Sequence, residues 1–177
     1  FEDRFEHSGT PPDICAKNIC YTDAMPSFDV VIHDRFYAHI RLKVPGAHNL
    51  LNALAAIGCA YSYDVPGDLV ERVLCDFEGA EGRFSIKGSF QGGRVITDYA
   101  HHPAAARATL DAAALMGYNN IWVVFQPLTY HRTKVLFDDY VQALLPCRHI
   151  IFSEIFTDRE APPFDISSSD LAEANND

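Results

Sequence analysis

The chain has 177 residues, 48% of them hydrophobic, which is enough to bury the core of one domain or of one domain and part of another. Its 14 lysines and arginines face 24 aspartates and glutamates, and the net charge of −10 argues against a nucleic-acid or anionic-membrane partner. Anionic substrates would therefore need local positive sites.

The first part of the chain predicts two strands followed by two helices. Runs of β-forming residues at 28–32 and 37–42 suggest a hairpin-like strand pair. After the Pro-Gly break at 45–46, residues 48–61 are apolar on nearly every side, which predicts a buried helix. A second helix is expected at 66–77, where apolar residues recur at helical spacing.

A polar, glycine-rich stretch from Gly79 to Gly82 predicts a domain boundary, which gives domains at 1–79 and 80–177. Beyond it we predict strands at 85–88, 94–98, 121–125 and 149–152, and helices at 103–116 and 134–145. The alternation of strands and helices indicates a parallel α/β sheet. Residues 121–125 are apolar without alternation, as expected for a strand covered on both faces.

In a parallel sheet, ligands bind beyond the carboxyl ends of the strands, here at 97–103 and 126–133. Asp98 ends a strand, where a carboxylate can accept hydrogen bonds from ribose hydroxyls; an ordinary strand-end carboxylate is the alternative. His101 and His102 open the next helix, where backbone N–H groups favour anions. They could also be plain helix caps, and a metal site is the weakest alternative because no cysteine or carboxylate stands at ligand spacing.

Two arginines and two asparagines are further candidates. Arg83 follows the predicted boundary and could clamp a phosphate between domains, unless it is an exposed linker residue. Arg132 lies in the second strand-end loop and suits a carboxylate or phosphate. Asn49 and Asn52 share a helix face and could pair with adenine, although Asn49 could simply cap the helix. Neither G-x-x-x-x-G-K-[ST] nor G-x-G-x-x-G occurs, so no complete phosphate site is encoded here.

Five cysteines, an odd number without a C-x-x-C pair, favour a reducing compartment. Cys59 lies within an apolar run, where we expect its thiol to pack as a small hydrophobe. The sequence has no apolar run of about 18 residues and no signal-peptide pattern, so we predict a cytoplasmic protein without a membrane span. The chain begins with Phe1 and not with Met, and we expect it to be an internal fragment.

Together these segments resemble the Mur ligase family. The run V-P-G-A-H-N-L-L-N at 44–52 resembles the helix that follows the family's ATPase core, and G-R-F at 82–84 resembles its linker arginine. The runs D-Y-A-H-H-P at 98–103 and F-Q-P-x-x-Y-x-R-T at 125–133 are similar to the members that add L-alanine. The resemblance covers 14–171 and implies the end of a central ATPase domain followed by a Rossmann-like, mostly parallel-sheet C-terminal domain.

By this resemblance the full enzyme uses ATP and Mg²⁺ to convert the carboxylate of UDP-N-acetylmuramate into an acyl phosphate, which the amine of L-alanine attacks. The main phosphate loop and the magnesium ligands would lie before Phe1, so we expect no metal ligand in this chain. Arg83, His101 and Arg132 are the implied catalytic residues. The implied contacts are Asn49 and Asn52 with adenine, Asp98 with the ribose, Arg83 with the ribose and phosphates, and Tyr99, His101 and Arg132 with the carboxylate or incoming amino acid.

The chain departs from the family pattern at three places. Gly82 stands where an arginine is usual, Leu128 and Thr129 replace His-Arg, and His131 replaces Ser or Thr. These changes bear on which arginines hold the substrate. Two alternatives stay open, namely the recycling ligase that attaches a tripeptide to UDP-N-acetylmuramate, and a non-catalytic module with a nucleotide-binding-like surface.

Overall fold

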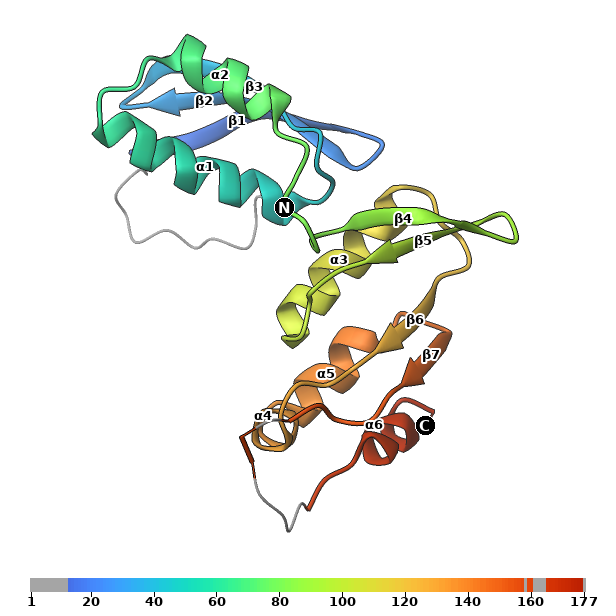
Figure 1. The fold of residues 1–177 in the computed structure, drawn as a ribbon. Helices are drawn as coiled ribbons and strands as arrows, with labels where there is room; N and C mark the ends of the chain where they lie inside the picture. Colours follow the sequence, from blue (N-terminus) through green and yellow to red (C-terminus); the bar gives the residue numbers. More distant parts are fainter. Residues whose placement is uncertain (1–12, 158, 161–164, 177) are drawn as a thin grey trace. The chain divides into compact units, whose positions relative to one another are not determined.

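The computed structural model describes residues 13–157, 159–160 and 165–176. The chain divides into two compact units, one ending at Glu78 and the other beginning at Gly79, and each is described by itself (Figure 1). The first twelve residues of the predicted first domain, and Asp177 at the end of the predicted second, lie outside the described residues. No helix in the described ranges is both long and apolar enough to span a bilayer.

The first unit is built on a three-stranded antiparallel sheet in the order β1 (Ile14–Thr22), β2 (Met25–Ile32), β3 (Arg35–Arg41). The predicted strand pair is confirmed as β2 and β3, while β1 was not predicted. Side chains of β2 alternate between buried and half-buried, as a strand with one core-facing side should. The buried set therefore points to one face of the sheet.

Helices α1 (Ala47–Ser62) and α2 (Gly67–Asp76) confirm the two predicted helices (Figure 1). The expectation of a fully buried first helix is wrong, because only one stripe of α1 reaches the core, while Leu51 stays 44% exposed. Cys59 is likewise exposed. A helix packed on one face of a single sheet has only one side covered. The core of this unit comprises Phe28, Val30, Ile32, Ala38, Ile40, Leu42, Leu50, Ala53, Ile57 and Val70.

The second unit contains four strands and four helices within its described residues (Figure 1). In chain order they are β4 (Ser85–Phe90), β5 (Gly93–Thr97), α3 (Pro103–Leu115), β6 (Trp122–Phe125), α4 (Tyr130–Val135), α5 (Phe137–Leu144), β7 (His149–Phe152) and α6 (Ser168–Ala174). Its core comprises Ala106, Phe125, Tyr140, Leu144 and Leu171. The mixed α/β class of this unit is confirmed.

The predicted mostly parallel sheet is only partly correct. Strands β6 and β7 pair in parallel, but β4 and β5 form a separate antiparallel hairpin. Between β5 and β6 lies a cavity of about 470 Å³, lined by consecutive residues of both strands and by the inner side of α3. No ladder joins β5 to β6 in the part of the chain described.

Two local expectations in this unit are also corrected. The predicted strand 121–125 is not covered on both faces, since Trp122 is 62% exposed and Val124 73% exposed. The predicted helix 134–145 is two helices, α4 and α5, with Leu136 between them in a non-helical conformation (φ −106°, ψ 22°). The break is local, because Leu136 N still donates to Arg132 O and Leu136 O accepts from Tyr140 N.

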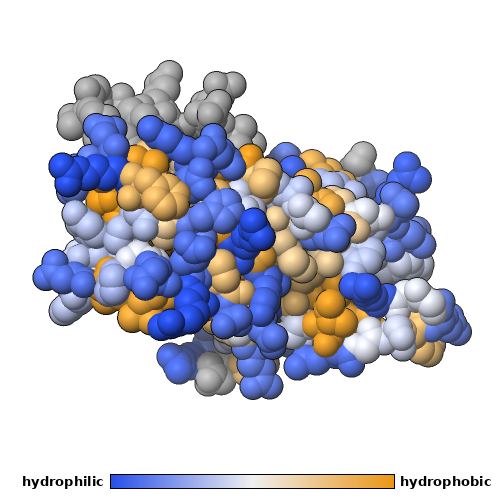
Figure 2. Space-filling view, turned by 90° about the horizontal axis from the view of Figure 1, so that it is seen from above, coloured by the Kyte–Doolittle hydropathy of each residue, from blue (hydrophilic) through white to orange (hydrophobic). Residues whose placement is uncertain are grey.

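Exposed apolar side chains occur in both units. On the face shown in Figure 2, hydrophobic residues are interspersed with hydrophilic ones. Isolated exposed apolar residues are ordinary on protein surfaces, so they carry no functional argument by themselves.

Candidate functional site

Asp98 follows β5, and its carboxylate folds back onto the turn that precedes β4. Oδ2 accepts a hydrogen bond from the backbone N–H of Phe84 at 2.9 Å, and Oδ1 lies 3.8 Å from a guanidinium nitrogen of Arg83. Phe84 has a left-handed backbone (φ 45°), which non-glycine residues rarely adopt. Asp98, 14% exposed, thus stabilises a turn, as the strand-end alternative expected, and its ribose contact stays a prediction.

Arg83, Tyr99 and His101 lie in a row of contacts. The guanidinium carbon of Arg83 is 5.7 Å from the centroid of the Tyr99 ring, within cation–π range. The rings of Tyr99 and His101 meet edge to face at 4.9 Å, and His101 Nδ1 lies 3.0 Å from the carbonyl oxygen of Tyr99. Tyr99 is 63% exposed, so one side of this row faces solvent. The structure therefore brings three predicted site residues together.

His102 is a helix cap. Its Nδ1 accepts a hydrogen bond from the backbone N–H of Ala104 at 3.2 Å, which places it at the N-cap of α3, directly before Pro103. The cap alternative is thus confirmed for His102, whereas His101 bonds to Tyr99. Over the described ranges, no group of three histidine, cysteine, aspartate or glutamate side chains is placed to hold a metal ion.

Tyr140 anchors the first strand-end loop, a role that the sequence did not reveal. Its fully buried hydroxyl donates to the carbonyl oxygen of His101 at 2.7 Å. Burial raises the pKa of this hydroxyl, while the positive charge of Arg132 acts in the opposite direction. In the sequence Tyr140 is one apolar position of a helix stripe, and its partner lies 39 residues earlier, so no local signal identifies it.

Tyr140→Phe should lower the free energy of unfolding by about 1 kcal/mol, because the carbonyl of His101 loses its donor in a buried setting. Tyr118→Phe is the matched control, since the buried hydroxyl of Tyr118 has no hydrogen-bond partner among the described residues. Urea denaturation of both variants measures the difference. Equal losses would show that the hydroxyl of Tyr140 contributes nothing specific.

Arg132 lies on α4, whose entry is fixed by backbone contacts to a later segment. Leu128 forms a parallel bridge with Phe156, and Thr129 N donates to Phe156 O at 2.8 Å. Thr129 has a left-handed φ of 65° and caps α4, accepting from Arg132 N at 3.4 Å. The departure at Thr129 therefore supplies a helix cap. The guanidinium of Arg132 has no ion-pair partner among the residues that the structure describes.

Asn49 and Asn52 share one face of α1, as predicted. Asn52 Nδ2 donates to Asn49 Oδ1 at 3.2 Å, and Asn49 Nδ2 donates to Pro45 O at 2.8 Å. The alternative that Asn49 is the N-cap is wrong, because Gly46 holds that position with φ 98°. These amides belong to the first unit, so contact with adenine stays a prediction.

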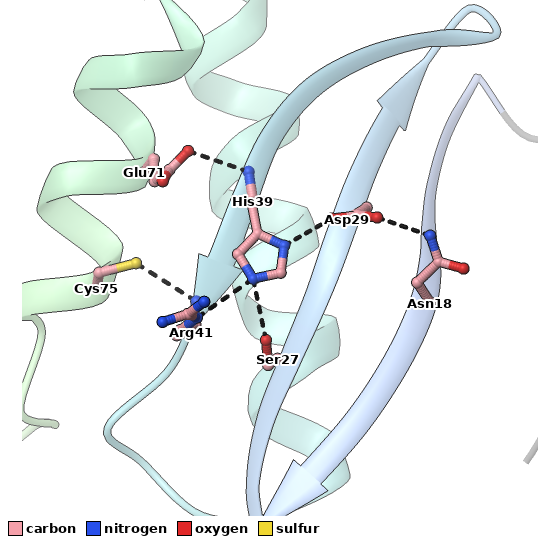
Figure 3. A network of polar contacts seen from close by, with 7 residues as sticks. All are labelled: Asn18, Ser27, Asp29, His39, Arg41, Glu71 and Cys75. Carbon is pink, nitrogen blue, oxygen red and sulfur yellow. Dashed lines mark hydrogen bonds and ion pairs between the residues drawn. The ribbon is translucent and has the colours of Figure 1, made fainter.

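The first unit holds a second polar cluster, the network drawn in Figure 3. His39 Nδ1 lies 2.6 Å from Asp29 Oδ1, and His39 Nε2 lies 3.2 Å from Ser27 Oγ. Asn18 donates to the other Asp29 oxygen at 2.7 Å. The hydrogen bonds from Asn18 and then His39 hold the pKa of Asp29 below its usual value, against the effect of burial. Serine, imidazole and carboxylate in this order resemble a nucleophilic triad.

The surroundings of this network favour a structural role. A nucleophilic serine also needs N–H donors aimed at the developing oxyanion. The backbone N–H groups beside the imidazole are already occupied, because His39 N donates to Glu71 Oε2 at 3.2 Å and Arg41 N donates to Cys75 Sγ at 3.4 Å (Figure 3). These bonds connect the outer edge of β3 to α2, and we assign the network no catalytic role.

Known proteins resemble this chain in sequence. The family model for the glutamate ligase domain of Mur ligases matches residues 82–176. The UDP-N-acetylmuramate–L-alanine ligase of Clostridium novyi (strain NT) is 40% identical over 161 residues, which are 91% of this chain and 35% of that protein. The chain thus spans about a third of the length of the relatives that it matches.

Two solved structures resemble the fold. The UDP-N-acetylmuramate-alanine ligase of Thermotoga maritima has a TM-score of 0.68 at 29% identity, covering 81% of this chain and 32% of that one. A murein peptide ligase of Psychrobacter arcticus 273-4 has a TM-score of 0.60 at 27% identity, covering 79% of this chain and 30% of that one.

Proposed function

This chain belongs to the Mur ligase family, and on that premise we propose that the whole protein is an ATP-dependent ligase that joins L-alanine to UDP-N-acetylmuramate in peptidoglycan precursor synthesis. The activity named for its relatives at about 40% identity supports this substrate pair. Because both the UDP-sugar and ATP are cytoplasmic nucleotides in this scheme, we place the reaction in the cytoplasm.

The observation that supports the proposal most is the gathering of predicted site residues in the second unit. Arg83, Tyr99 and His101 are in contact, and the hydroxyl of Tyr140, on which the positive charge of Arg132 acts, donates to the carbonyl of His101. Arg83 and the residues at 99–101 are separate in sequence, and their contact in the second unit supports a common site. Cationic and hydrogen-bonding groups gathered in this way suit a carboxylate and an acyl phosphate.

In the proposed reaction, the amine of L-alanine attacks the acyl carbon, a C–N bond forms, and the C–O bond to phosphate breaks as the amine loses a proton. We assign Arg132 to the carboxylate of L-alanine, because its guanidinium is free of ion pairs within the described part of the chain. Arg83 is assigned to the phosphate side and His101, beside Tyr99, to the incoming amine. Each group acts by positioning and charge.

For ATP we propose contacts from Asn49 and Asn52 to adenine and from Asp98 to the ribose. The carboxylate of Asp98 fits that role, because both of its oxygens can accept further hydrogen bonds. Oδ2 accepts one hydrogen bond, from Phe84 N, and Oδ1 lies 3.8 Å from the guanidinium of Arg83. When bound, Mg²⁺ would screen the charge of the nucleotide phosphates. We assign its ligands and the main phosphate loop to parts of the protein outside this chain.

The second candidate is the recycling ligase that attaches a tripeptide to UDP-N-acetylmuramate, which the likeness to the murein peptide ligase favours. The C. novyi relative and the F-Q-P-x-x-Y-x-R-T run at 125–133 favour L-alanine instead. The third hypothesis is a non-catalytic module, in which case no form of the protein should catalyse ligation.

The test is ligation by the full-length protein. We expect ADP release and the alanyl amide product with UDP-N-acetylmuramate, ATP, Mg²⁺ and L-alanine, and a much smaller kcat/KM with a tripeptide. The 177-residue chain alone should release no ADP, because it lacks a phosphate loop. Preference for the tripeptide would support the recycling ligase, and no turnover with either acceptor would support the non-catalytic module.

A further inference from the structure

Glu160 makes a two-pronged contact with the start of α4. Its Oε2 accepts from Tyr130 N at 2.6 Å and its Oε1 accepts from His131 N at 2.8 Å. These are the first two residues of the helix, whose N–H groups have no partner within a helix. Each carboxylate oxygen thus serves a different backbone donor, and the side chain is half-buried.

The electrostatics of Glu160 are consistent with a persistent contact. Burial raises its pKa, but the hydrogen bonds from His131 N and Tyr130 N, that from Thr157 and the charge of His131 together outweigh burial and lower it. A lowered pKa in the folded protein means that the ionised form stabilises the fold at neutral pH, and this stabilisation is lost as pH falls through the lowered pKa. The carboxylate is therefore ionised at neutral pH.

The contact holds a turn that the backbone does not favour by itself. Thr129, directly before α4, has φ 65°. Its N–H donates to Phe156 O at 2.8 Å, and its carbonyl accepts from the buried hydroxyl of Thr133 at 2.7 Å. Glu160 completes this set of ties on the two residues that follow Thr129. Arg132 comes next in the chain, so its direction depends on how α4 begins.

We propose that Glu160 is a positioning residue for Arg132, which it sets in place by fixing the first turn of α4. This inference rests on the proposed function, since Arg132 is assigned there to the carboxylate of L-alanine. Glu160 is no ion-pair partner of Arg132 among the described residues, so it acts through the backbone and leaves the guanidinium free for a ligand.

The test uses Glu160→Ala in the full-length protein. We expect KM for L-alanine to rise about tenfold or more, with KM for ATP within about twofold of wild type, because misplacing one substrate clamp weakens that substrate alone. For Glu160→Gln we expect a KM for L-alanine between those of wild type and Glu160→Ala, because the amide oxygen of glutamine can accept from only one of the two N–H groups. In the double variant of Glu160→Ala with Arg132→Lys, KM for L-alanine should be within about twofold of its value in Arg132→Lys alone, because both changes affect the same contact.

Asp165→Asn is the matched control, because it removes the ion pair to Lys134 and so another tie between α4 and the later segment, without touching the helix start. Its KM for L-alanine should stay within about twofold of wild type. Hydrogen exchange gives a readout besides activity. The amides of Tyr130 and His131 should exchange faster in Glu160→Ala, while the amide of Leu144 in α5 should not change.

Unchanged exchange at Tyr130 and His131 would overturn the proposal, as would faster exchange with unchanged KM for L-alanine. An equal rise in KM for L-alanine in Asp165→Asn would also overturn it, because any loosening of α4 would then suffice. Failure of the wild-type protein to ligate L-alanine at all would instead overturn the proposed function, and the role of Glu160 with it.

Discussion

Arg132→Lys should lower kcat/KM for L-alanine at least tenfold in the full-length protein, a loss of about 1.4 kcal/mol or more of transition-state stabilisation. Thr129 stands where the family pattern has a second arginine, and the structure shows it capping α4 instead. Arg132 would then serve alone where two cations are usual. A guanidinium binds a carboxylate through two parallel hydrogen bonds, which the ammonium of lysine does not reproduce.

Michaelis constants measured separately for ATP, UDP-N-acetylmuramate and L-alanine check this expectation. The KM for ATP should change little. Arg107→Lys is the matched control, because Arg107 pairs with Asp111 on the exposed side of α3 and belongs to the same unit. If Arg132→Lys keeps kcat/KM within about twofold of wild type and behaves as Arg107→Lys does, Arg132 is not the substrate clamp.

Asp98→Asn is expected to raise KM for ATP roughly tenfold to 150-fold while leaving KM for UDP-N-acetylmuramate nearly unchanged. The estimate follows from the loss of a charge-assisted acceptor for the ribose hydroxyls, worth about 1.5–3 kcal/mol. Asparagine suits the test, because its side-chain oxygen can still accept from Phe84 N and so keep the turn that Asp98 holds.

Ser85→Ala provides the control for that turn. It removes the hydrogen bond from Gly82 N to Ser85 Oγ at 3.0 Å and loosens the same turn without changing the carboxylate. Its KM for ATP should stay within about twofold of wild type, with a small fall in Tm. If both variants weaken ATP equally, or if Asp98→Asn weakens both substrates equally, Asp98 is structural and not part of the adenosine site.

The predicted helices and strands are confirmed where a local sequence pattern is sufficient to specify them. Strands β2 and β3 and helices α1 and α2 follow from alternation, from helical spacing and from the Pro-Gly break at 45–46. The extent of burial did not follow. Residues 121–125 and 48–61 are apolar enough to be covered on all sides, yet Val124 and Leu51 are exposed, because burial depends on which elements pack against a segment.

The arrangement of strands in the second unit could not be predicted from local sequence patterns either. Alternating strands and helices indicate parallel pairing, and β6 with β7 follow that rule, but β5 pairs with its hairpin partner β4 and not with β6. Strand pairing is a contact between distant segments, so periodicity in one segment cannot specify it.

The family resemblance and the candidate residues follow from the amino-acid sequence, because motif spacing is a property of the chain. The candidates found in this way are Arg83, Asp98, Tyr99, His101 and Arg132. Their anchoring contacts are visible only in the folded chain: Asp98 accepts from Phe84 N, the carbonyl of His101 accepts from Tyr140, and Glu160 holds the start of α4. Tyr140 and Glu160 are an ordinary core aromatic and an ordinary acid in sequence. Their partners lie 39 and about 30 residues away, and side-chain contacts with distant backbone groups leave no local pattern to detect.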